Sequence, residues 1–104
     1  VRFGSAHLQP GFLEESTLQL LWARQRTSSG EETNYGLGWQ FGEDPEGRPT
    51  IGHGGGADGG TSQLLMHADV GLVVAVQVNL TDAGIGRVTR EVTAIFRREL
   101  ETGN

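Results

Sequence analysis

The ten residues from Ile51 to Gly60, IGHGGGADGG, contain six glycines and one histidine, His53. Inside a strand, a glycine is destabilising by about 0.5–1 kcal/mol relative to alanine, because it loses more conformational freedom on folding. Repeated glycines in one stretch therefore indicate that the absence of side chains has a use there. The usual use is close approach by a ligand or by another segment of the chain. We therefore expect this stretch to lie where something else meets the main chain.

The patterning on both sides of the glycine-rich stretch predicts strands. Period-two alternation predicts a strand over 35–41, and similar patterns predict strands over 48–54, 61–68 and 72–80. The last of these begins with a continuous apolar run, Leu72–Val76, which is typical of a strand buried on both faces. In the first strand, the alternation places four side chains on one face: Tyr35, Leu37, Trp39 and Phe41.

Helices are predicted before and after the strands. Residues 1–8 resemble the end of a helix, residues 14–25 have helical spacing, and a third helix follows Thr81 or Asp82, either of which is a suitable N-cap. We expect the apolar stripe of this third helix to face the sheet and its arginines to face solvent. The stripe consists of Ile85, Val88, Val92, Ile95, Phe96 and Leu100. The predicted fold class is α+β, an antiparallel sheet of about four strands flanked by helices, with the C-terminal helix packed on the sheet.

Composition excludes several kinds of function. The net charge of −5 offers nothing to nucleic-acid phosphates. All eight basic residues are arginine and cysteine is absent, so lysine chemistry and thiolate metal sites are impossible in this chain. No apolar run approaches the roughly 20 residues of a transmembrane helix. The three histidines fit no metal-ligand spacing, and we expect His7 and His67 to lie at the surface. We expect no metal and no cofactor.

Gly54, Gly56 and Gly59 also satisfy the pattern G-x-G-x-x-G of nucleotide-binding loops. The dinucleotide fingerprint needs a helix after the glycines, whereas the sequence after them, TSQLLMHA, is typical of a strand. The kinase type of glycine loop lies between two strands but works with a lysine, which this chain lacks. Nucleotide binding therefore stays a minor alternative, beside a turn that has no chemical role.

Four segments in a fixed order resemble a known family. The sequence YGLGW, a short hairpin, GHGGGADGGTSQLLMHADVGLVVAVQVNL and an amphipathic helix are similar to the C-terminal end of serine β-lactamases and penicillin-binding-protein-like hydrolases. The resemblance is strongest to the class C-like branch, which includes esterases and D-amino-acid peptidases, and it spans essentially all 104 residues. It implies hydrolysis of a small ester, amide or peptide through an acyl-serine.

The resemblance also implies roles for individual residues. The family's third motif is Lys or His, then Thr, Ser or Gly, then Gly, and the match is His53-Gly54-Gly55. His53 would lie at the edge of the cleft, Gly54 and Gly55 would line it, and the Gly56 N–H would help to stabilise the oxyanion. Asp58 would reach the substrate, although a turn residue is the simpler reading.

Two other family motifs have no match. The S-x-x-K motif needs a lysine, and Tyr35-Gly36-Leu37 is not the family's Y-x-N. We therefore expect residues 1–104 to be one domain fragment, inactive alone, of a larger hydrolase. Gly54 replaces a frequent hydroxyl residue, which weakens the case for β-lactamase activity itself.

Three further points stay open. A non-catalytic binding or assembly module of the same fold is the alternative to an enzyme. The resemblance suggests a periplasmic or secreted location and leaves a cytoplasmic location open. An exposed sheet face predicts self-association of the isolated chain.

Overall fold

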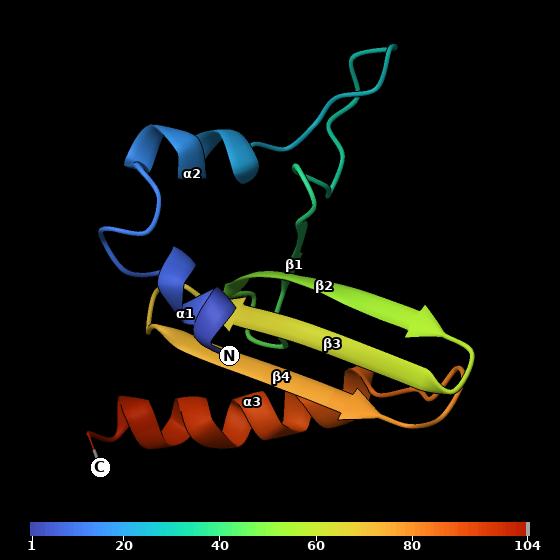
Figure 1. Ribbon diagram of the computed structural model, residues 1–104. Helices are drawn as coiled ribbons and strands as arrows, with labels where there is room; N and C mark the ends of the chain where they lie inside the picture. The colour runs from blue at the N-terminus through green and yellow to red at the C-terminus, as the bar shows by residue number, and fades with distance from the viewer. Residues whose placement is uncertain (104) are drawn as a thin grey trace.

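A four-stranded antiparallel sheet with three helices forms the fold, and the computed structural model describes residues 1–103 (Figure 1). The strand order is β1-β2-β3-β4, so each strand pairs with the next one along the chain. This is the predicted α+β class. The helices and strands are α1 (Arg2–His7), α2 (Glu15–Leu21), β1 (Gln40–Glu43), β2 (Pro49–Ala57), β3 (Gly60–His67), β4 (Leu72–Val78) and α3 (Gly86–Glu101).

The two faces of the sheet carry different helices (Figure 1). Helix α3 packs on β3 and β4, and Val74 is buried beneath it. Helix α1 packs on the opposite face, where Gly4 lies so close to β4 that a Cβ atom would come 2.6 Å from Cγ1 of Val73. The prediction that β4 is buried on both faces is wrong in part, because Ala75 is exposed.

The predicted strand over 35–41 is mostly wrong. Only its last two residues belong to β1, and the chain before them turns at Gly38, whose φ of 81° is left-handed. The Gly36 N–H donates to the Trp39 carbonyl at 2.7 Å, which closes this turn. Trp39 is therefore buried while Leu37 is 54% exposed, although alternation placed them on one face.

The predicted face of α3 is also wrong. Its buried side chains are Thr89, Thr93 and Arg97. The Thr89 hydroxyl donates to the Ile85 carbonyl at 2.9 Å and the Thr93 hydroxyl to the Thr89 carbonyl at 2.6 Å. Because these hydroxyls are satisfied inside the helix, the two threonines can be buried without an unpaired polar group.

The expected N-cap of this helix is wrong too. The helix begins at Gly86, after Ile85, and Asp82 lies before it with a φ of 51°. The Thr81 hydroxyl accepts the Gly59 N–H at 2.7 Å instead of capping the helix. Thr81 therefore ties the tip of the β2–β3 hairpin to the segment that leads into α3.

Most of the predicted apolar stripe of α3 is exposed. Val88, Ile95, Phe96 and Leu100 are between 48% and 56% exposed. We expect an isolated chain of residues 1–104 to self-associate through this stripe, because exposed apolar patches promote association. Sedimentation velocity should show that Phe96→Ser weakens the association. The control is Leu80→Ser, which removes an equally exposed side chain away from the helix. A sharply monomeric wild-type chain would contradict this expectation.

The end of α3 is held by a buried polar network. Arg97 is 4% exposed and donates to His67 Nδ1 at 2.9 Å and to both oxygens of Asp69. His67 is 1% exposed, so the expectation of a surface histidine is wrong, as is that of a solvated Arg97. An arginine only donates, so Nδ1 of His67 accepts and Nε2 carries the proton. That Nε2 is buried with no partner among residues 1–103.

Stability should depend on pH through His67. Burial and the neighbouring Arg97 lower the pKa of His67 below its ordinary value. The unfolded chain therefore binds more protons than the folded one just below pH 6.5, and the free energy of unfolding should fall as the pH drops from 6.5. Urea denaturation between pH 5 and 7 should show a positive slope, of at most about 1.4 kcal/mol per pH unit. The slope should shrink in His67→Gln, and an unchanged slope would contradict this assignment.

Candidate functional site

The glycine-rich stretch forms the second half of β2, at an open edge of the sheet. Strand β1 pairs with β2 only from Pro49 to Gly52. Beyond Gly52, no strand within residues 1–103 lies on the outer side of β2, while β3 pairs along its inner side (Figure 1). The backbone from His53 to Ala57 therefore has one edge available to another molecule or segment.

His53 is half-buried on this edge strand, and both of its ring nitrogens have partners. Nδ1 lies 2.5 Å from the Gly54 carbonyl oxygen, and Nε2 lies 2.6 Å from the Tyr35 hydroxyl. The Tyr35 ring meets the imidazole edge to face, with centroids 5.6 Å apart. His53 is the side chain with acid–base chemistry in this part of the strand, and Tyr35 holds it from outside the sheet.

The glycines of β2 differ in how much room surrounds them. A Cβ at Gly52 would come 2.2 Å from the Leu64 carbonyl oxygen, so the fold itself requires glycine there. At Gly54 and Gly55 the nearest atoms would be the Gln63 Oε1 and Ser62 Oγ, at 3.2 and 2.9 Å. Nothing within residues 1–103 lies within 4 Å of a Cβ at Gly56. The bare backbone at Gly56 is thus not explained by packing inside this chain.

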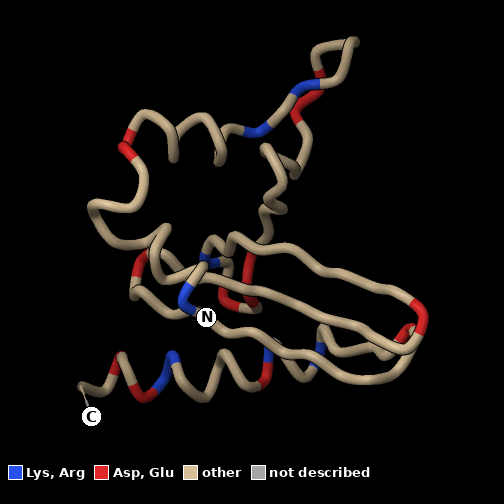
Figure 2. Tube along the Cα trace, in the orientation of Figure 1, with Lys and Arg blue, Asp and Glu red and all other residues tan. Residues whose placement is uncertain are grey.

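Open hollows flank these glycines. One, of about 390 Å³, is lined by His53 and Gly55 together with Ser62, Leu64 and neighbouring β4 residues. A second lies beyond it, around Gly56 and the start of β3. Strands β2, β3 and β4 carry no Asp, Glu, Lys or Arg along their lengths, and Figure 2 shows them in tan up to the acidic tip of the hairpin.

Asp58 lies at that tip and is exposed. The turn after it is completed by Gly59, whose φ of 82° is left-handed and favours glycine. Asp58 lines neither hollow, whereas Gly59 lines the second. The geometry thus gives Asp58 the position of a turn residue and leaves a role in substrate contact as a prediction.

The G-x-G-x-x-G pattern lies on a hairpin. Gly54 and Gly56 are in β2, Gly59 is in the turn, and β3 follows at Gly60. No helix N-terminus follows the glycines, so the arrangement that binds a pyrophosphate is missing from this loop. The position of the three glycines on a hairpin argues against dinucleotide binding by this loop.

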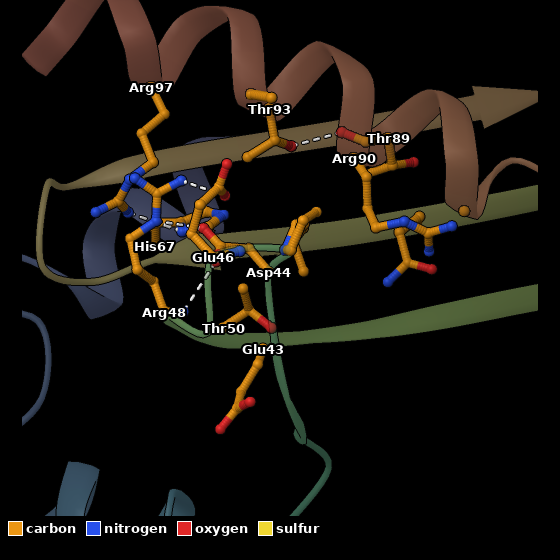
Figure 3. A pocket seen from close by; sticks show the side chains of 15 residues that line it. Glu43, Asp44, Glu46, Arg48, Thr50, His67, Thr89, Arg90, Thr93 and Arg97 are labelled. Atoms are coloured by element: carbon orange, nitrogen blue, oxygen red, sulfur yellow. Dashed lines mark hydrogen bonds and ion pairs between the residues drawn. The ribbon is translucent and has the colours of Figure 1, made fainter.

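A separate cavity of about 180 Å³ lies between α3 and the sheet (Figure 3). The charged groups at its rim are largely paired with one another. Arg48 is bonded to Asp44, Glu46 and Glu101, and Arg97 is bonded to Asp69 and Glu101. Such pairing stabilises the contact between α3 and the turn that joins β1 to β2. The charged groups of this cavity therefore have a structural role.

A serine nucleophile with its base is missing from the part of the chain that the structure describes. None of its serine hydroxyls is hydrogen-bonded to a histidine, and it contains no cluster of three or more residues suited to a metal ion. His7 is 5% exposed within an aromatic cluster with Phe3, Phe12 and Trp39, so the expectation of a surface residue is wrong. No described helix is long and apolar enough to cross a membrane.

Tyr35 is the residue that sequence reasoning missed. The alternation of 35–41 placed it on a strand face, whereas the turn at Gly38 brings its hydroxyl to His53. The contact spans 18 positions, and the sequence offered only the presence of one tyrosine shortly before the His-Gly-Gly motif.

Comparison with known proteins places this arrangement in a family. The family model described as Beta-lactamase matches residues 1–95. Penicillin-binding protein 4* of Bacillus subtilis (strain 168) is 28% identical over 68 residues, which are 65% of this chain and 15% of that protein. The chain therefore spans only a small part of the curated relative that it matches. On the family match, the chain belongs to the β-lactamase family, whose penicillin-binding-protein-like members share its serine-hydrolase-like fold.

Proposed function

We propose that this chain supplies one wall of the active site of a serine hydrolase, which cleaves an ester or amide through an acyl-serine. The observation that carries the proposal is the open edge of β2, where His53 stands on the same strand as Gly56, a glycine that no packing within residues 1–103 explains. In this proposal residues 1–104 are a domain fragment, and the nucleophile and its base come from another part of the same protein.

The chemistry of acyl transfer accounts for the bare strand. Negative charge develops on the carbonyl oxygen of the substrate, and a fixed N–H donor stabilises it by about 2.7–4 kcal/mol. The Gly56 N–H is the donor in this proposal, and Gly54 and Gly55 leave room for the substrate to lie along the strand. His53 hydrogen-bonds the substrate or the catalytic groups at the edge of the cleft.

Activity-based labelling tests the proposal. The full-length protein should react covalently with a fluorophosphonate probe and hydrolyse p-nitrophenyl esters, and nitrocefin should be a poor substrate because Gly54 lacks a hydroxyl. The isolated chain of residues 1–104 should not be labelled. Labelling of the isolated chain would place the nucleophile within it and overturn the fragment proposal. A full-length protein that neither reacts nor hydrolyses would support the binding-module alternative.

Two glycine variants separate substrate access from folding. Gly56→Val should lower kcat/KM by about 100-fold, because a branched side chain displaces the substrate from its reactive position. It should leave the free energy of unfolding within about 0.5 kcal/mol, since no atom of residues 1–103 lies within 4 Å of a Cβ at this position. Gly52→Ala should instead destabilise the protein by about 1–3 kcal/mol, through the clash with the Leu64 carbonyl.

Steady-state kinetics and urea denaturation measure the two effects. Equal destabilisation by the two variants would show that Gly56 is kept for the fold. Full activity in Gly56→Val would remove the argument for substrate at this strand.

A further inference from the structure

We propose that Tyr35 is a positioning residue for His53, holding its ring in the orientation in which Nδ1 donates to the Gly54 carbonyl oxygen. The inference rests on the proposed function for its catalytic meaning, and on geometry alone for the positioning. It concerns a tyrosine distinct from that of the Y-x-N motif, which Tyr35-Gly36-Leu37 does not match.

The hydrogen bonds of His53 define its tautomer. A carbonyl oxygen only accepts, so the 2.5 Å contact with Gly54 requires a proton on Nδ1. The neutral ring then has its lone pair on Nε2, and the Tyr35 hydroxyl donates to it at 2.6 Å. Removal of the hydroxyl would take away the donor to Nε2, and the bond to the Gly54 carbonyl oxygen alone would then hold the ring.

The main chain holds Tyr35 in place independently of His53. The Tyr35 carbonyl accepts the Gln25 N–H at 2.8 Å, and Tyr35 forms an isolated antiparallel bridge with Gln40 at the start of β1. The next residue must be glycine, because a Cβ at Gly36 would come 2.3 Å from the Leu21 carbonyl oxygen. The main chain therefore fixes the position from which the Tyr35 phenol contacts His53.

This arrangement suits a histidine on an open edge. His53 is only half-buried, and its strand has no neighbour on the outer side beyond Gly52 within residues 1–103. Packing alone leaves such a ring free to rotate, whereas two hydrogen bonds in different directions define both its plane and its tautomer. Preorganisation of this kind lowers the cost of reaching the reactive geometry.

Tyr35→Phe in the full-length protein tests the positioning. Phenylalanine keeps the edge-to-face contact and removes only the hydroxyl. With ¹⁵N-labelled histidine, and signals assigned by His53→Gln, the neutral wild-type ring should show a protonated Nδ1. In the variant the Nε2 signal should shift, because that nitrogen loses its hydrogen-bond donor. A ¹⁵N spectrum that is identical in the two proteins overturns the proposal.

Kinetics test whether the positioning matters. Tyr35→Phe should lower kcat up to about tenfold, the size of one lost hydrogen bond, and change KM by less than about twofold. In a His53→Ala background, Tyr35→Phe should have no further effect, whereas an equal loss there would show that Tyr35 acts elsewhere and overturn the proposal. If wild type and variants all lack activity, the proposed hydrolase function fails, and the ¹⁵N spectra still decide whether Tyr35 holds His53.

Discussion

His53→Ala in the full-length protein is expected to lower kcat/KM for an ester substrate by about 100-fold or more. The expectation follows from the place of His53 at the open edge of β2 and from the contribution of 10²–10⁴-fold that positioned acid–base groups typically make. The fold should survive, because the side chain is only half-buried and its partners are the Tyr35 hydroxyl and one carbonyl oxygen. Steady-state kinetics with p-nitrophenyl esters measure the change.

His53→Gln sharpens this experiment, because glutamine can hydrogen-bond but does not titrate near neutral pH. Recovery of activity by glutamine would assign His53 a hydrogen-bonding role, and continued loss would assign it proton transfer. Retention of full activity by both variants would remove His53 from the active site. Circular dichroism and the urea midpoint serve as the check that both variants are folded.

Arg97→Leu is expected to destabilise the protein by about 2–3 kcal/mol. The substitution removes the donor to buried His67 Nδ1 and the partner of Asp69. The hydrogen bond from Arg97 to Asp69, although Asp69 is half exposed, lowers the pKa of that carboxyl. Urea denaturation at pH 7 measures the loss.

Arg98→Leu is the matched control for this substitution. Arg98 is the next residue of α3 and is exposed, so its replacement should change the free energy of unfolding by less than about 0.5 kcal/mol. Equal effects of the two substitutions would show that the loss of helical charge, and not the buried network, is responsible. A stable Arg97→Leu protein would show that apolar packing replaces the network without loss.

The strands of the sheet could be predicted where the residues that set the sequence pattern are also those that form the strand and its turns. Strands β3 and β4 contain apolar runs bounded by turn residues, and the turn after Asp58 needs the left-handed φ that Gly59 supplies. The segment 35–41 shows the limit of alternation. Alternation puts Gly36 and Gly38 together on one face of a strand, whereas Gly36 permits a close contact with the Leu21 carbonyl and Gly38 permits a turn.

The apolar stripe of α3 misled for a different physical reason. Periodicity identifies an apolar face, but it does not identify which face meets the sheet. A threonine can be buried as readily as a leucine when its hydroxyl donates to a carbonyl of the same helix. An arginine can be buried when its charge is paired with a carboxylate. Those partners come from the helix backbone and from the end of β3.

The sequence by itself determined the α+β class, the antiparallel hairpins and the match of His53-Gly54-Gly55 to a family motif. These depend on side-chain period, on turn residues and on the order of short motifs, all of which are local. Only the tertiary structure decided that β2 is open beyond Gly52, that Tyr35 reaches His53 and that Arg97 is buried beside His67. Each of these contacts joins residues 12 or more positions apart or depends on strand order, and no local pattern encodes such pairings.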